Sequence, residues 1–158
     1  MTDAIDASLR ETFAMMVGDE VEFVQKTTLD PSLRSPLTTV DLDNAVDRQM
    51  TVVVGLSGDL QGSVSVCLDQ AAALDWTEKL IDHQTEQVDQ IVVDAIGELG
   101  NMTVGGAKSR VDGFSLKLGL PSVLLTGHQH LAFPTQCRPI EMQYRYQSWD
   151  LRVFVALV

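Results

Sequence analysis

Two β-branched runs joined by a short turn constrain the fold of this chain more than any other feature. Met50–Leu56 and Leu60–Leu68 are rich in valine, and Ser57-Gly58-Asp59 between them has the composition of a tight turn. In the second run, apolar residues alternate with smaller ones, which indicates that one face is buried. The pattern predicts an antiparallel β-hairpin whose apolar face must be covered by other elements.

Three further segments have apolar residues at the spacings of three and four that are typical of amphipathic helices. They are residues 3–17, Asp69–Asp82 with Asp69 as a capping residue, and Gln87–Arg110, which Asp112-Gly113 would end. More strands are predicted at Val21–Gln25, Phe114–Leu118, Ser122–Thr126, Ile140–Gln147 and Leu151–Val158, with an irregular connection over 27–49 and a turn at Ser148-Trp149-Asp150. We therefore expect an α+β fold in which helices pack on an antiparallel β-sheet.

Length and charge narrow the class of protein. A chain of 158 residues fits a single domain over 1–158, and 22 acidic against 11 basic side chains give a formal charge of −11. Such a charge repels phosphate backbones and anionic lipids, so we expect no nucleic-acid or membrane partner. The acidic amino-terminal residues do not form a signal peptide pattern, and Cys67 and Cys137 form neither a metal cluster nor a disulfide framework. We expect a cytoplasmic protein with reduced thiols.

The helix predicted over Gln87–Arg110 has a polar face that is a candidate site. At about 100° per residue, Asp94, Glu98, Asn101 and Gly105 fall within about 60° of one another, opposite the apolar stripe. A carboxamide can orient a water molecule and a carboxylate can bind a lysine, but neither is a good nucleophile without an activating group. The face suits a hydrolysis in which a partner supplies the remaining groups.

Three glycines lie around this face, although each costs a helix about 1 kcal/mol relative to alanine. One interpretation is that Gly97, Gly100 and Gly105 leave space for a partner around the carboxylate and the amide. The alternative is that Gly97 and Gly100 pack against another helix, while Glu98 and Asn101 belong to a solvated outer surface. Periodicity leaves both interpretations open.

The sequence of this helix, Asp94-Ala-Ile-Gly-Glu98-Leu-Gly-Asn101-Met-Thr-Val-Gly-Gly-Ala-Lys108, resembles the CheX/CheC/FliY family of phosphatases, which dephosphorylate chemotaxis response regulators. The resemblance extends through Gly55–Val66 before the helix and Leu118–Gly127 after it. With its length and its single Glu-x-x-Asn pair, the chain looks most like a stand-alone CheX.

The family pattern is Asp or Ser, three residues, Glu, two residues, Asn and a downstream Pro. Asp94, Glu98 and Asn101 match it, and Pro121 lies slightly closer to Asn101 than in the pattern.

The resemblance also implies a pseudo-symmetric, CheC-like fold. Residues 11–18 repeat residues 98–105 at Glu, Met, Val and Gly, with Ala14 at the place of Asn101. This looks like a diverged half-repeat in which only the second helix is active.

By this resemblance, the chain is a protein phosphatase that acts on the aspartyl-phosphate of a phosphorylated CheY-like receiver domain. Asn101 would position a water molecule for in-line attack, and Glu98 would pair with the receiver's active-site lysine. The receiver would supply Mg²⁺, so the chain needs no metal or cofactor of its own. Gly97 and Gly105 would allow close approach, and Asp94 would either contact the receiver or support the helix surface. CheX members pair through their sheets, which implies a homodimer.

Two rival functions stay open at this point. One is a non-catalytic module of the same fold that binds a receiver or a flagellar-switch partner. The other is a sensory or ligand-binding domain that has kept the fold alone.

Other motifs are weaker. His128-Gln-His130 has no third zinc ligand near it, and Cys67 and Cys137 have no arginine six positions later, as a cysteine phosphatase would require. Asp41-Leu-Asp43 resembles the motif of aspartate-based phosphatases, but it lies in a polar connection instead of at the end of a buried strand.

Overall fold

The structure is a computed structural model that describes residues 1–29, 49–125 and 137–158. Within these ranges, seven antiparallel strands form one sheet in the order β1-β6-β7-β3-β2-β4, and β5 also pairs with β2. The helices are α1 (Thr2–Met16), α2 (Gln70–Ile81) and α3 (Gln90–Lys108). The strands are β1 (Val21–Thr28), β2 (Gln49–Gly58), β3 (Gly62–Asp69), β4 (Leu116–Leu118), β5 (Ser122–Leu125), β6 (Ile140–Tyr146) and β7 (Trp149–Leu157). The predicted α+β fold is confirmed.

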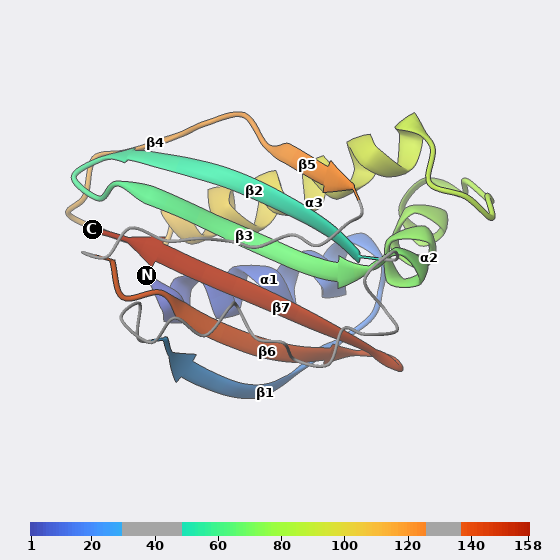
Figure 1. The fold of residues 1–158 in the computed structure, drawn as a ribbon, viewed down its shortest axis with the longest axis horizontal. Helices are drawn as coiled ribbons and strands as arrows, with labels where there is room; N and C mark the ends of the chain where they lie inside the picture. Colours follow the sequence, from blue (N-terminus) through green and yellow to red (C-terminus); the bar gives the residue numbers. More distant parts are fainter. Residues whose placement is uncertain (30–48, 126–136) are drawn as a thin grey trace.

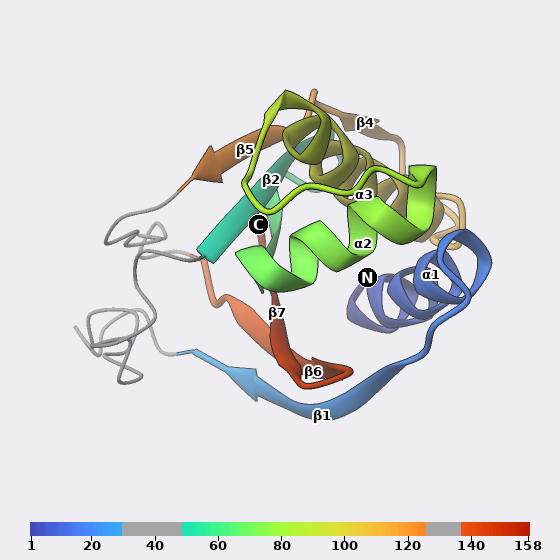
Figure 2. The same cartoon turned by 90° about the vertical axis from the view of Figure 1, so that its right-hand side faces the viewer.

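All three helices lie on one face of the sheet, which curves around them (Figures 1 and 2). The predicted hairpin is β2 and β3, and its valines pair across the strands, Val52 with Val66 and Val54 with Val64. These valines are buried on the helix side, because alternate residues of a strand point to the same face. Phe13 of α1 packs against Trp76 of α2, and their ring centroids are 4.7 Å apart.

The strand order has an internal two-fold pattern. β3 and β7 pair at the centre, β2 and β6 lie next to them, and β1 and the β4–β5 segment form the edges. Helix α1 precedes the edge strand β1, and α3 precedes the other edge. The two helices pack together, and the Ser8 hydroxyl donates to the Met102 carbonyl at 3.4 Å. This topology agrees with the sequence repeat between residues 11–18 and 98–105.

Helix α3 is shorter at both ends than predicted. It begins at Gln90 because the Asp89 carboxylate accepts the Val92 N–H at 3.0 Å as an N-cap. This bond, together with one from His83 Nε2 at 2.8 Å, lowers the pKa of Asp89. The helix ends at Lys108, so that Asp112-Gly113 forms a turn beyond it, with Gly113 at a φ of +82°.

The predicted turn at Ser148-Trp149-Asp150 begins one residue too late and ends two residues too late. Tyr146 and Trp149 are already paired, and Gln147 reverses the chain with a φ of 52°. Trp149 and Asp150 therefore belong to β7. The two edge strands also differ from the predicted bounds. β1 was predicted to end at Gln25 but continues to Thr28, because it pairs along the whole of β6. β4 was predicted to begin at Phe114 but begins at Leu116.

Candidate functional site

The middle of α3 exposes one narrow polar face. Asp94, Glu98 and Asn101 are exposed, as their helical spacing predicted. The buried residues of the helix are Val92, Ala95, Ile96, Gly97, Leu99, Gly100, Thr103, Val104 and Ala107. Because this buried surface is broad, packing fixes the helix on its other sides and gives the three polar side chains a rigid support.

The polar side chains of this face make few interactions with one another. Asn101 Nδ2 lies 3.4 Å from Glu98 Oε2, which is a long hydrogen bond, and Gln90 Nε2 donates to Asp94 Oδ1 at 2.8 Å. Among the described residues, neither Glu98 nor Asp94 forms an ion pair with a lysine or arginine. The Glu98 carboxylate is thus available to a cation from a partner. Within the described ranges, the Asn101 amide is restrained only by one long hydrogen bond.

The glycines of α3 have different roles. A Cβ on Gly100 would lie 2.6 Å from Val52 Cγ2, so this glycine lets the helix rest on β2. Gly97 is buried, and a Cβ there would lie 3.8 Å from Pro121 Cγ. The interpretation of Gly100 as open space for a partner is therefore wrong, because Gly100 packs against the sheet instead of against a partner or another helix. At Gly97 the nearest side-chain atom lies 3.8 Å from the Cβ position, and its role toward a partner stays a prediction. Gly105 is half-buried at the border of the polar face.

The segment between β4 and β5 forms one border of this face. Pro121 lies beside Gly97, and Leu118 Cδ1 lies 3.8 Å from the Cβ position of Gly105. Gly97, Asn101 and Gly105 are four residues apart, so they form one row along the helix. The segment therefore runs alongside the row that contains Asn101.

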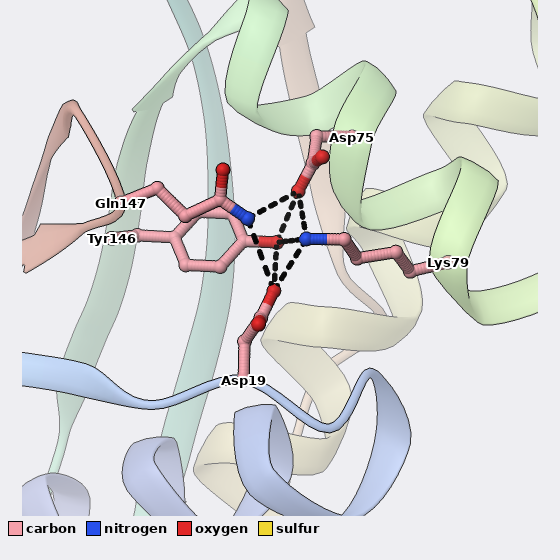
Figure 3. Close-up of polar contacts among 5 residues, drawn as sticks. All are labelled: Asp19, Asp75, Lys79, Tyr146 and Gln147. Carbon is pink, nitrogen blue, oxygen red and sulfur yellow. Dashed lines mark hydrogen bonds and ion pairs between the residues drawn. The ribbon is translucent and has the colours of Figure 1, made fainter.

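A second polar cluster lies at the β6–β7 turn and was missed by sequence reasoning (Figure 3). Its members are Asp19 before β1, Asp75 and Lys79 of α2, and Tyr146 and Gln147. Lys79 Nζ lies 2.5 Å from an Asp19 oxygen and 3.0 Å from an Asp75 oxygen. The Tyr146 hydroxyl and the Gln147 amide donate to the same two carboxylates. The only sequence signal was the spacing of four between Asp75 and Lys79.

The charged groups of the cluster stabilise one another, and their pKa shifts show this. The hydrogen bond from Lys79 is the largest cause that lowers the pKa of Asp19. Burial acts to lower the pKa of Lys79, but its bonds to Asp19 and Asp75 together raise it. Burial, then the bond to Asp75, raises the pKa of Tyr146. Because every member is bound to another, the cluster ties α2 to the chain before β1 and to the β6–β7 turn.

Replacing Lys79 with methionine tests this structural role. We expect Lys79→Met to lower the free energy of unfolding at pH 7 by about 1 kcal/mol, since partly exposed ion pairs contribute at this level. A lowered pKa means that the ionised Asp19 favours the folded state. That contribution is complete well above the ordinary pKa of 3.8 and is lost as the pH falls below 3.8 and through the lowered pKa of the folded state. Urea titrations from pH 7 to pH 3 should therefore show a shallower acid loss in the variant.

The matched control is Lys26→Met, because Lys26 lies 3.6 Å from an Asp3 oxygen that is almost fully exposed. It should leave the stability and its pH dependence unchanged. Equal effects of the two substitutions would contradict a specific role for the cluster.

The weaker motifs contribute no site among the described residues. Cys67 is buried, burial raises its pKa, and the Thr51 hydroxyl contacts its sulfur at 3.3 Å, so this thiol is unreactive. Cys137 is also buried. His128-Gln-His130 and Asp41-Leu-Asp43 lie outside the described residues. In the part of the chain that is described, no three metal-ligating side chains gather, and no helix is long and apolar enough to cross a membrane.

Comparison with known proteins shows which families have this sequence and fold. Residues 50–145 match the family model described as chemotaxis phosphatase CheX. The CheY-P phosphatase CheX of Thermotoga maritima is 26% identical over 106 residues, which are 66% of this chain and 61% of that protein. A CheC-like superfamily protein from Shewanella sp. PV-4 has a TM-score of 0.82 at 19% identity, over 99% of this chain and 96% of that one. The CheX of the CheX–CheY–BeF₃–Mg²⁺ complex from Borrelia burgdorferi has a TM-score of 0.77 at 16% identity, with the same coverage.

The structural likeness defines the class, a CheC-like α+β fold. The family match covers more than half of the chain and includes all of α3. The chain belongs to the CheX family of chemotaxis phosphatases.

Proposed function

We propose that this protein hydrolyses the aspartyl-phosphate of a CheY-like receiver domain, with Asn101 positioning the attacking water and Glu98 binding the receiver's lysine. The observation that carries the proposal is the exposed pair Glu98 and Asn101, one turn apart on a helix whose other sides are packed. Among the described residues, Glu98 forms no ion pair, and its bond to Asn101 is long. Two relatives support it: one is called a CheY-P phosphatase, and another was crystallised with CheY.

The chemistry needs little from this chain beyond position. The water oxygen bonds to phosphorus as the bond from phosphorus to the aspartyl oxygen breaks, which yields a free carboxylate and inorganic phosphate. The Asn101 carbonyl oxygen can accept a hydrogen bond from the water and so hold the water oxygen in line with the breaking bond, and the protons of the water leave with the inorganic phosphate or to solvent. The receiver's Mg²⁺ would neutralise charge on the phosphoryl oxygens, and no metal or cofactor of this chain is required.

Glu98 is proposed to bind the receiver, because its carboxylate lies beside Asn101 and can form an ion pair with a lysine of the receiver. An ion pair at this point would fix the receiver's phosphoaspartate opposite the amide. Asp94, one turn before Glu98 and bonded to Gln90, is proposed to add a contact at the edge of the same surface. Gly105 at the other end would allow close approach.

Removing the Glu98 carboxylate should weaken both binding and turnover. We expect Glu98→Ala to raise the Kd for a BeF₃-activated receiver about 10-fold, the loss typical of one interfacial charge pair. Glu22→Ala on β1 is the matched control, because it changes the net charge equally and lies on an exposed strand position. Calorimetric titration of both variants measures the difference. An unchanged Kd for Glu98→Ala would show that the lysine pair is wrong.

A non-catalytic module of the same fold is the second candidate, since the same exposed face could bind a receiver without turnover. The test is to measure both binding to BeF₃-activated receivers and the decay of phosphorylated ones from the same cell. Binding together with faster decay supports the phosphatase, and binding without faster decay identifies the module. If no receiver is bound and none decays faster, the remaining candidate is a sensory or ligand-binding domain.

We also propose that the protein is a cytoplasmic homodimer, as its resemblance to CheX implies. Sedimentation velocity down to micromolar concentrations tests the dimer, and a monomer throughout would contradict it.

A further inference from the structure

Leu120 is the most exposed large apolar residue in the described part of the chain, with 91% of its surface accessible. It belongs to the segment between β4 and β5 that borders the polar face of α3. An exposed leucine is not unusual by itself. Its place at the edge of the sheet, beside the polar face of α3, makes it a candidate for contact with a partner.

A bulge in the edge strand directs Leu120 outward. Leu118 pairs with Leu56 and Ser122 pairs with Val53, so three residues of the edge segment oppose two residues of β2. The Gly119 N–H still donates to the Gly55 carbonyl at 2.8 Å, which holds the start of the bulge. Bulges of this kind redirect a side chain and are common beside active sites.

The bulge also lies next to Asn101. Its flanks lie beside the row of Gly97, Asn101 and Gly105: a Cβ on Gly97 would lie 3.8 Å from Pro121 Cγ, and a Cβ on Gly105 would lie 3.8 Å from Leu118 Cδ1 at the end of β4. Because eight helical residues rise about 12 Å, the segment between these contacts passes Asn101 itself. Leu120 is therefore fixed at the side of the residue that would reach into the receiver.

A receiver that reaches Asn101 must also cover Leu120. An asparagine side chain is short, so the partner surface must approach α3 closely. A standard interface buries about 800 Å² on each partner, which corresponds to a disc of about 16 Å radius. Such a disc centred on Asn101 includes the whole bulge. The combination of a central polar pair and an apolar neighbour is typical of an interface.

We propose that Leu120 is an apolar docking residue for the phosphorylated receiver, inserted against an apolar patch beside the receiver's phosphorylation site. This inference rests on the proposed function, because the receiver is the occupant that Asn101 requires. Leu120 acts in binding and does not touch the reacting atoms. Its loss should therefore raise KM and leave kcat nearly unchanged.

The experiment compares Leu120→Ser with Met15→Ser, which removes another exposed apolar side chain, on α1. Leu120→Ser should raise both KM for the phosphorylated receiver and Kd for the BeF₃-activated receiver about 10-fold, as expected when part of a leucine is no longer buried. Its kcat should stay within about twofold of the wild-type value, and Met15→Ser should change neither constant. Thermal melting checks that both variants fold.

Unchanged KM and Kd in Leu120→Ser would overturn the proposal, and so would a fall in kcat alone. A change in the oligomeric state of the chain by itself would assign Leu120 to a second copy and would also overturn it. If the wild-type chain binds the activated receiver without hastening its decay, the proposed function fails. The Kd comparison still decides the role of Leu120 in that case. Absence of any binding overturns both.

Discussion

Asn101→Ala is expected to lower the rate constant for receiver dephosphorylation about 100-fold or more, the usual effect of losing one positioned polar group in an active site. Among the described residues, the exposed amide forms one hydrogen bond, to Glu98 at 3.4 Å, so its removal should not disturb the fold. Affinity for a BeF₃-activated receiver should change by less than about threefold, because the water is positioned only in the reacting complex. Single-turnover decay of the phosphorylated receiver measures the rate, and calorimetry measures the affinity.

Gln61→Ala is the control for this prediction, since it removes an exposed amide from the β2–β3 turn. It should leave the rate unchanged. A purified Asn101→Ala protein that dephosphorylated the receiver at the wild-type rate would eliminate the mechanism. A loss of affinity as large as the loss of rate would show that Asn101 serves docking instead of catalysis.

Gly100→Ala should lower the stability of the protein, although alanine favours a helix more than glycine does. Its Cβ would lie 2.6 Å from Val52 Cγ2 and 3.3 Å from Val54 Cγ2. Both are branched side chains on a paired central strand, so they have little freedom to move. Overpacking of this kind costs about 1–3 kcal/mol, against a gain of about 1 kcal/mol in helix propensity. Because the two valines have little freedom to move, we expect a cost of about 2–3 kcal/mol and so a net loss of about 1–2 kcal/mol in the free energy of unfolding, measured by urea titration.

Gly105→Ala is the matched control on the same helix, because its Cβ would lie 3.8 Å from Leu118 Cδ1, an ordinary contact. It should raise the free energy of unfolding by up to about 1 kcal/mol. The same variant tests whether Gly105 allows close approach of the receiver. A lower affinity for the receiver in a variant of higher stability would support this role. Equal stabilities of the two variants would contradict the packing of Gly100 on β2.

Features that depend on local spacing could be predicted from the sequence. The alternation in residues 60–68 predicted the β2–β3 hairpin, and the helical period placed Glu98 and Asn101 on one exposed face. The end of α3 was predicted two residues too late, at Arg110. The turn residues Asp112-Gly113 mark a limit that the helix cannot pass, but they do not show that it already ends at Lys108.

Features that depend on contacts between distant segments could not be predicted. Gly100 is required by Val52, about fifty residues earlier, and no local pattern shows that contact. The cluster around Lys79 joins Asp19 to Tyr146, which only the folded sheet brings together. The bulge at Leu120 depends on how the edge segment pairs with β2, and strand register is set by the whole sheet.

The most direct test of the central claim is whether the protein is a catalyst for receiver dephosphorylation. Receivers from the same cell are phosphorylated with a small-molecule phosphodonor, freed of the donor, and mixed with wild-type protein at about one-hundredth of their concentration. The proposed function predicts that one receiver loses all of its phosphate much faster than by spontaneous hydrolysis, with many turnovers per protein molecule and none from Asn101→Ala. Decay at the spontaneous rate for every receiver, with binding to an activated one, would contradict the claim and make the protein a binding module.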